Sequence, residues 1–269
     1  MLLALVLVGC FPSAFARYGW DAIDLASINH APELSGGHLF GTDQVGRDVL
    51  SRTIYGLHTT IEIGFAVAFL AVVIGATVGM LAGYYGGFAD AVVMRVVDVV
   101  TAYPAVVISL AAIVYLRRVV PHTLVLLLAV YLWTVAARVV RAQVAAVRES
   151  EFVEAARAAG ASDLRIIGRH VLPNIAGTLL VVTTGLLGQA VLLDATIEFF
   201  SYGMPASTFP SLGNLIADVT NSGGLGVSAY QVLGWWTWLF PGLVLALLLV
   251  AINILGDAID EALNPAITA

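Results

Sequence analysis

Long apolar runs separated by short polar stretches dominate this chain. A membrane span needs about 20 mostly apolar residues, because a helix rises about 1.5 Å per residue and the hydrocarbon core is roughly 30 Å thick. The runs that reach this length cover residues 61–83, 96–116, 119–141, 175–200 and 235–255. Residues 1–16 form a sixth, shorter run. The pattern predicts an all-α, polytopic membrane protein with about six transmembrane helices.

The same pattern divides the chain into three parts. Residues 1–57 hold the short first helix and a polar segment that we expect outside the membrane. Residues 58–257 form the core transmembrane domain, which contains a charged loop at residues 145–174. Residues 258–269 are expected to form a cytoplasmic tail.

The arginines predict the orientation of the spans. Cytoplasmic loops of membrane proteins carry an excess of basic residues. Six of the 12 arginines lie within residues 138–169, whereas the pair Arg117–Arg118 lies in a loop on the opposite side. Because the six form the denser cluster, we expect residues 84–95 and 138–172, with both termini, on the cytoplasmic side. Trp235 and the tryptophans that follow it then mark the outer interface.

The polar segment before the second run contains "FGTDQVGRDVLSRTIYG", residues 40–56. Apolar residues recur in it at helical spacing, and Thr42 or Asp43 is a residue type that caps helix N-termini. We therefore predict a short helix at the membrane surface here.

Four glycines in and just after the second run, Gly75, Gly79, Gly83 and Gly87, are each four residues apart. Glycines at this interval line one helix face and allow a neighbouring backbone to approach closely. They predict a packing face toward another helix of this chain or toward a second subunit.

Acidic residues and a proline interrupt the apolar runs. Asp98 begins the third span and Pro104 breaks it, which predicts a kink. Asp194 and Glu198 are one helical turn apart on the fifth span and so share a face. Ionisable residues inside a membrane usually have a function, so we take Asp98, Asp194 and Glu198 as candidates for a translocation path. The alternative is that Asp194 and Glu198 are solvated at the outer end of their span.

Composition excludes several classes of protein. The chain is 60% hydrophobic and 11% charged, with a mean hydropathy of +0.95, which is outside the range of soluble domains. It contains no Lys, so a phosphate-binding G-x-x-x-x-G-K-[ST] loop is impossible and any ATP must be hydrolysed by another chain. The single cysteine and five scattered histidines show no metal-ligand spacing, and there is no nucleophile motif. We expect neither an enzyme nor a metal site.

The charged passage at residues 150–174 predicts two short amphipathic helices. Gly160 is expected to end the first in a left-handed turn. Ser150 and Ser162 are candidate N-caps. The predicted apolar stripes are Phe152, Val153, Ala156 and Ala159 on the first helix and Leu164, Ile167 and Val171 on the second. Such a unit either docks on a partner or rests on lipid headgroups.

These residues resemble a known motif. "EAARAAG" at residues 154–160, followed by "HVLPN" at 170–174, resembles the EAA loop of ABC-importer permeases. "FGTDQVGRDVLSRTIYG" resembles a hallmark of the C-type permease of dipeptide and oligopeptide importers. "AGYYGGFADAVVMRVVDVVTAYP" and "LFPGLVLALLLVAINILGDAIDEALNP" are similar to the same subfamily. Together the four motifs cover residues 39–265.

The resemblance implies a type I ABC importer in the cytoplasmic membrane of a prokaryote. The implied partners are a homologous B-type permease, one or two cytoplasmic ATPase subunits, an external solute-binding protein and the lipid bilayer, with no nucleic acid. The chain would bind no cofactor, and ATP and Mg would sit on the ATPases. The implied contacts to the ATPase are Glu154, Ala155, Ala156, Gly160, Ser162 and Asp163.

Departures from the subfamily leave the cargo open. The stretch "EFFSYGMPASTFPSLG" has Glu198 where serine is common and Leu212 where tryptophan is usual, and Asp260 stands where arginine is common. Residues 201–234 form a loop that is either flexible or re-entrant. Cargo can be dipeptides, oligopeptides, haem, glutathione or nickel chelates. A more distant alternative is an ion-coupled secondary carrier.

Overall fold

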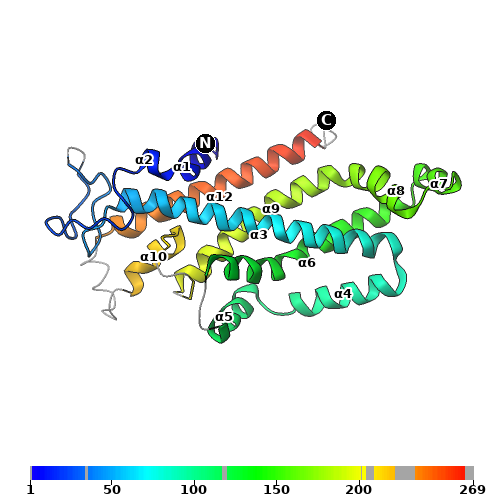
Figure 1. The fold of residues 1–269 in the computed structure, drawn as a ribbon, viewed down its shortest axis with the longest axis horizontal. Coiled ribbons are helices and arrows are strands. Elements are labelled where there is room, and N and C mark those ends of the chain that lie inside the picture. The colour runs from blue at the N-terminus through cyan, green and yellow to red at the C-terminus, as the bar shows by residue number, and fades with distance from the viewer. Residues whose placement is uncertain are drawn as a thin grey trace.

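The computed structural model describes residues 2–33, 36–116, 120–200, 202–203, 209–221 and 234–263. These residues form an elongated bundle of helices (Figure 1). The helices are α1 (Leu2–Cys10), α2 (Pro12–Phe15), α3 (Val49–Tyr85), α4 (Gly87–Thr101), α5 (Ala105–Leu116), α6 (Pro121–Arg148), α7 (Glu151–Ala158), α8 (Asp163–Ile166), the π-helix η1 (Ile167–Val171), α9 (Leu172–Phe199), α10 (Leu212–Asn221) and α12 (Trp236–Leu263). Extended pairing in the described residues is limited to two isolated bridges in the segment before α3.

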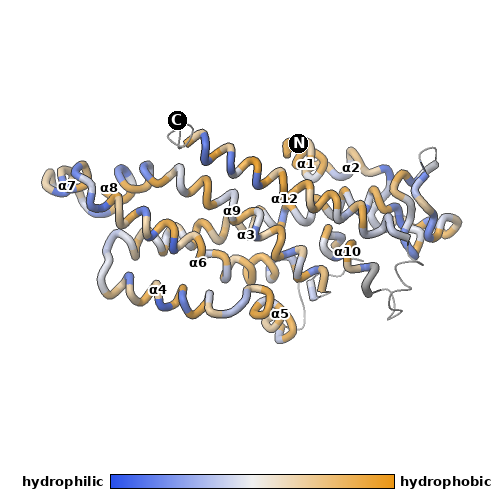
Figure 2. Tube along the Cα trace, turned by 180° about the vertical axis from the view of Figure 1, so that it is seen from behind, coloured by the Kyte–Doolittle hydropathy of each residue, from blue (hydrophilic) through white to orange (hydrophobic). Residues whose placement is uncertain are grey.

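Five of the predicted spans are present in the described residues. α3, α6 and α12 are each long and apolar enough to cross a membrane, and so is the continuous helix from Asp163 to Phe199. α4 and α5 form the fifth as a broken pair bent by 80°. Figure 2 shows the apolar positions along these helices and the hydrophilic positions gathered toward the two ends of the bundle.

The sixth apolar run does not form one helix. It divides at Phe11 and Pro12 into α1, of nine residues, and α2, of four. Proline has no N–H and is favoured in the first turn of a helix, and Pro12 is the first residue of α2. α1 packs against α3, where the His58 Nδ1 lies 2.7 Å from the Gly9 carbonyl oxygen.

α3 begins at Val49, before the predicted span at residue 61 and after the predicted cap of the surface helix. Its N-cap is Asp48, whose carboxylate accepts a hydrogen bond from the Ser51 N–H at 2.7 Å. The predicted cap at Thr42 or Asp43, and the separate surface helix, are wrong. Asp43 instead accepts the N–H groups of Val45 and Arg47, which holds residues 43–47 in a turn.

The break between α4 and α5 lies at Ala102–Pro104. The residue before a proline is disfavoured in the helical region, so α4 stops and a new helix starts after Pro104. The predicted kink is therefore a full break. The Tyr131 hydroxyl of α6 donates to the Tyr103 carbonyl oxygen at 3.4 Å and holds the turn against the bundle.

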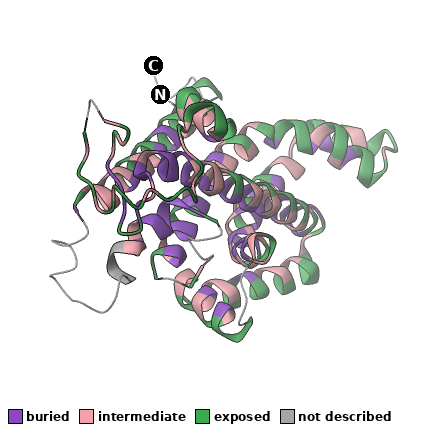
Figure 3. Ribbon diagram, turned by 60° about the vertical axis from the view of Figure 1, so that its left-hand side comes forward, coloured by how far each residue is buried: buried purple, intermediate pink, exposed green. Residues whose placement is uncertain are grey.

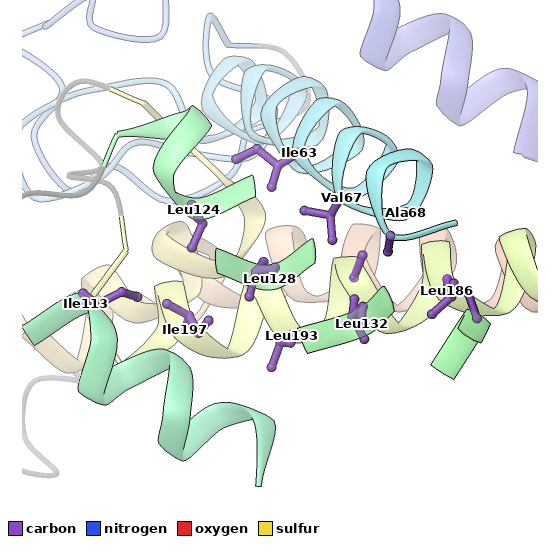
Figure 4. Packing of buried hydrophobic residues seen from close by; sticks show 13 residues of the cluster. Ile63, Val67, Ala68, Ile113, Leu124, Leu128, Leu132, Leu186, Leu193 and Ile197 are labelled. Atoms are coloured by element: carbon purple, nitrogen blue, oxygen red, sulfur yellow. The ribbon is translucent and has the colours of Figure 1, made fainter. Parts of the chain in front are cut away.

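The main apolar core lies between α3, α5, α6 and α9. Figure 4 shows the side chains of this cluster, including Ile63, Val67, Leu128, Leu132 and Leu186, pointing toward one another from these helices. Figure 3 shows buried residues concentrated in the middle of the bundle, with exposed residues on the outer helix faces.

Glycines allow α3 and α6 to approach closely. A Cβ added to Gly75 would lie 2.5 Å from the Ala136 Cβ, and one on Gly79 or Gly83 would lie 2.6 Å from a carbonyl oxygen of α6. Gly87 does not share this face. It starts α4 with a φ of +59°, and an added Cβ there would meet nothing within 4 Å. The chain has already turned at Gly86, so helical periodicity no longer applies.

The loop after the fifth span folds back into the bundle. α10 packs against α3, α9 and α12, and Leu212, Leu215 and Ala217 on it are buried. The rest of this loop lies mostly outside the described residues. α12 then continues without interruption to Leu263, so the predicted boundary at residue 257 falls inside a helix.

Candidate functional site

The charged loop forms one end of the molecule, opposite the polar segment that precedes α3 (Figure 1). It contacts the turn between α3 and α4. The Tyr84 hydroxyl donates to Asp163 at 2.8 Å, and the Arg148 guanidinium donates to the Tyr84 carbonyl oxygen at 3.1 Å. Residues 84–95 and 138–172, which the arginine pattern predicts on one side, therefore meet at one end.

Gly160 closes α7 with a Schellman motif. Its φ is +82°, its N–H donates to the Arg157 carbonyl oxygen at 3.0 Å, and the Ala161 N–H donates to the Ala156 carbonyl oxygen at 3.1 Å. This is the pattern in which a left-handed residue satisfies the last carbonyls of a helix. The predicted turn at Gly160 is confirmed.

An apolar cluster anchors the loop to the bundle. Val153 of α7, Ile166 of α8 and Val171 of η1 are each fully buried, and they pack with Val140 and Val144 of α6. Tyr84 of α3 belongs to the same cluster, so the loop is held from beneath by side chains of α3 and α6.

The predicted stripe on the second helix is confirmed at Val171 and wrong at Leu164, and Ile167 is half-buried. Leu164 is 80% exposed, and the buried positions are Ile166 and Val171, five residues apart. Residues 167–171 form a π-helix, whose i to i+5 hydrogen bonds widen the turn, so the α-helical spacing does not carry from Ile166 to Val171. The structure also joins α8, η1 and α9 into one continuous helix, so the second amphipathic helix is not separate from the fifth span.

The outer surface of the loop is a mixed ridge. Glu154, Ala155, Gly160, Ser162 and Asp163 are exposed, whereas Ala156 is half-buried against the cluster beneath. Phe152 is 45% exposed, which adds an apolar side chain to the ridge.

Neither serine at the helix starts forms a side-chain cap. Ser150 is the N-cap residue of α7, but its hydroxyl donates to the Val147 carbonyl oxygen at 2.6 Å, and no cap bond forms at Ser162.

Ion pairs fix α4 against α6 beside the loop. Arg141 donates through Nε to Asp90 at 2.8 Å and through a second nitrogen to the other carboxylate oxygen. Asp98, a candidate for the translocation path, pairs with Arg138 at 3.2 Å, and both side chains are more than half exposed. Sequence reasoning missed these partners because each pair joins helices 40 or more residues apart.

Asp194 and Glu198 lie inside the chain. Their exposed fractions are 0% and 1%, so the alternative of two solvated carboxylates is wrong. Both Asp194 oxygens are buried without a hydrogen-bond partner among the described residues. A Cβ on Gly203 would lie 2.3 Å from the Glu198 carboxyl carbon, so the backbone closes over that side chain. In this conformation the pair lines no open passage, and its role in translocation stays a prediction.

The hallmark segment before α3 is held by a buried arginine. Arg52 is 3% exposed and bonds Asp43 at 2.6 Å and Asp218 of α10 at 3.1 Å. The Trp236 indole N–H of α12 donates to the Thr42 carbonyl oxygen at 3.0 Å. The acidic and basic residues of this motif therefore join the outer segment to α3 and α10.

Across the described residues, no three His, Cys, Asp or Glu side chains gather in a metal-binding group.

The chain is similar in sequence, over most of its length, to permeases with known names. It is 37% identical to the oligopeptide transport system permease protein OppC of Mycobacterium tuberculosis, over 98% of this chain and 89% of the relative. It is 33% identical to the dipeptide transport system permease protein DppC of Alkalihalophilus pseudofirmus, over 86% of this chain and 73% of the relative. The OppC of Bacillus subtilis is 31% identical over 98% and 83%.

The fold is similar to a solved ABC importer. An inward-facing structure of the MetNI methionine ABC transporter matches with a TM-score of 0.61 and 22% identity, over 80% of this chain and 95% of that chain. The described helices thus have the type I ABC importer permease fold. Residues 75–269 match the family described as binding-protein-dependent transport system inner membrane component. The chain is a multi-pass inner-membrane protein and belongs to that family.

Proposed function

We propose that this chain is one transmembrane subunit of an ATP-driven importer that moves dipeptides or oligopeptides across the inner membrane. The peptide permeases among its relatives support this cargo class over haem, glutathione or nickel chelates. The observation that carries the proposal is the loop of α7 and α8. It is anchored beneath by buried Val153 and Ile166 and exposes Glu154, Ala155 and Gly160 outward.

Coupling follows from the geometry of this loop. An ATPase subunit that grips the exposed ridge moves α7 and α8 together, because the Schellman turn at Gly160 joins them tightly. α8, η1 and α9 form one continuous helix from Asp163 to Phe199. A displacement at the ridge therefore reaches the far end of α9, where Glu198 packs against α10.

The proposal includes the other members of the complex. A homologous B-type permease would complete the pore, and one or two ATPase subunits would bind ATP and Mg. A solute-binding protein would deliver cargo at the outer end. The lack of any Lys in this chain supports a separate ATPase, since a Walker-type loop requires one.

Reconstitution tests the proposal. The complete complex in liposomes should take up a labelled dipeptide or tetrapeptide only with ATP inside and loaded binding protein outside. Uptake driven by an ion gradient without ATP would point instead to an ion-coupled carrier. ATP-dependent uptake of haem or a nickel chelate, with no uptake of peptides, would contradict the cargo class.

A further inference from the structure

Three polar residues and a glycine lie on one face of α9, between its inner end and its middle. Asn174, Thr178, Gly185 and Gln189 recur at helical spacing and so share one face. Thr178 is half-buried and the other three are exposed. A Cβ added to Gly185 would meet nothing within 4 Å, so open space lies in front of this row.

A second polar row lies beside it on α12. Asn253, Asp257 and Asp260 are four and three residues apart and share a face. The two helices are in contact here, because a Cβ on Gly188 would lie 3.8 Å from the Asn253 side-chain oxygen. We call the two rows together the polar stripe. Figure 2 shows the hydrophilic positions in the last turns of α12.

Two cavities open along the polar stripe. One, of about 450 Å³, lies between α6, α9 and α12 and is lined by Gln143, Asn174, Thr178 and Asp260 among others. The other, of about 160 Å³, is lined by Thr184, Asn253, Asp257 and Asp260 among others. They share Val181 and Asp260 in their walls, so they adjoin.

Gln189 and Asn253 of the polar stripe lie at the depth of the hydrocarbon core, whereas Asp257 and Asp260 lie about 32 and 36 Å along α12 from Trp236, at the inner edge of that core. At about 1.5 Å per residue, Asn253 lies about 26 Å along α12 from Trp236 at its outer end, within a hydrocarbon core of roughly 30 Å. Gln189 lies about 15 Å from Phe199, the outer end of α9, near the middle of that core. Exposed amides are unfavourable in hydrocarbon and are retained where they face protein or water.

The lipid-facing side of α12 is a different row. Leu243, Leu247 and Ile254 are 49%, 46% and 58% exposed and follow one another at helical spacing. Successive residues of a helix point about 100° apart, so this row is centred about a quarter of a turn from the polar stripe. α12 thus separates an apolar face from a polar one.

We propose that the polar stripe is a wall of the water-filled cargo path, and that Asp257 and Asp260 make it favour cargo that carries a primary ammonium group, such as the free amino end of a peptide. The ionisable side chains that line the two cavities are both acidic, and no arginine lines either. The amides and hydroxyls of the remaining polar residues replace part of the water shell of a passing peptide. The choice of a peptide as cargo rests on the function proposed above.

Cysteine reactivity tests the water and charge without any cargo. The single native cysteine, Cys10, is first replaced by serine in the complete complex. Asn253→Cys is then compared with Ile254→Cys, which is also exposed but lies on the apolar row. Both receive a trimethylammonium and a sulfonate methanethiosulfonate, and each rate is divided by the rate with free cysteine.

The expected result is rapid reaction at position 253 and slow reaction at 254. Asp257 and Asp260 follow Asn253 by about 6 and 10.5 Å along the helix axis. Their screened field in water enriches a monovalent cation about twofold and depletes an anion about twofold, so the cationic reagent should react about fourfold faster. In the Asp257→Asn/Asp260→Asn background this ratio should fall to about one.

A slow reaction at position 253, equal to that at 254, would overturn the proposal, because the stripe would then be covered by lipid or by a partner helix. A cation preference that persists without the two carboxylates would overturn the charge assignment.

Uptake then tests the cargo. A peptide should be favoured over its N-acetylated form in wild type, and the asparagine variant should reduce this ratio. An unchanged ratio would contradict selection of ammonium cargo, whereas no uptake of either peptide by the wild-type complex would contradict the proposed function itself.

Discussion

Replacing Gly160 perturbs the loop that we propose to bind the ATPase, without touching any packing. The residue is exposed, and an added Cβ would meet no atom within 4 Å. Its φ of +82° is nevertheless a conformation that L side chains rarely adopt. A left-handed residue with a Cβ costs about 1–2 kcal/mol, and more for a β-branched one. Gly160→Ala should therefore strain the Schellman turn by about that amount, and Gly160→Val by more.

This strain destabilises the loop conformation that we propose to bind the ATPase. If ATPase binding requires the native turn, about 1–2 kcal/mol of strain lowers the affinity for the ATPase about 5- to 30-fold. Gly168 provides a matched control on the same loop. It is also exposed with open space around an added Cβ, but it lies within η1 and its φ is not positive. Gly168→Ala should leave the affinity unchanged, because alanine is favourable in a helix.

The assay measures the affinity of purified ATPase subunits for the permease pair, together with stimulation of ATP hydrolysis by loaded binding protein. Thermal unfolding of the permease pair serves as a check on folding, since the turn lies outside the apolar core. Wild-type affinity and stimulation in Gly160→Val would refute the role of this turn in coupling. Equal losses in Gly160→Ala and Gly168→Ala would refute the backbone explanation.

Three further outcomes follow from specific contacts. Arg52→Met should lower the free energy of unfolding by about 1.5–3 kcal/mol, because it removes charged hydrogen bonds to Asp43, which keeps Arg47, and to Asp218. Exposed Arg17→Met should change it little, and thermal unfolding in detergent compares the two variants. Gly79→Ala should destabilise the α3–α6 contact by about 1–3 kcal/mol through overpacking. Gly242→Ala should not, because its added Cβ meets open space, and equal melting temperatures of the two variants would contradict the close approach of α3 to α6. Tyr84→Phe removes one hydrogen bond to the loop and should lower the stability of the folded loop by about 0.5–1.5 kcal/mol. Hydrogen exchange in α8 should then be faster, and unchanged exchange would show that this bond does not hold the loop.

Sequence alone determined the features that depend on neighbouring residues. The spans follow from run length, because every backbone N–H and C=O in hydrocarbon must bond within its own helix. Pro104 and Gly160 act through their own backbone dihedrals, so a break and a left-handed turn could be assigned without knowing what packs against them. Gly75, Gly79 and Gly83 predicted a packing face, although the sequence did not say that α6 occupies it.

Tertiary structure decided the features that depend on distant partners. Asp43 is a residue type that caps helices, but its carboxylate forms ion pairs with Arg47 and Arg52. Asp48 therefore caps α3 instead. Ile166 is buried in place of Leu164 because it is the residue that meets Val140 and Val144 of α6, which are distant in sequence.

Asp194 and Glu198 show most clearly what the sequence could not predict about side-chain surroundings. The sequence placed them on one face of α9, but whether that face meets water or protein depended on α10 folding back over it. The polar stripe is the converse, since Asn253 and Ile254 are adjacent in sequence and only the position of α9 assigns them to different surroundings. Local propensities fix backbone geometry within a few residues, whereas the environment of a side chain is set by segments that the chain brings together only on folding.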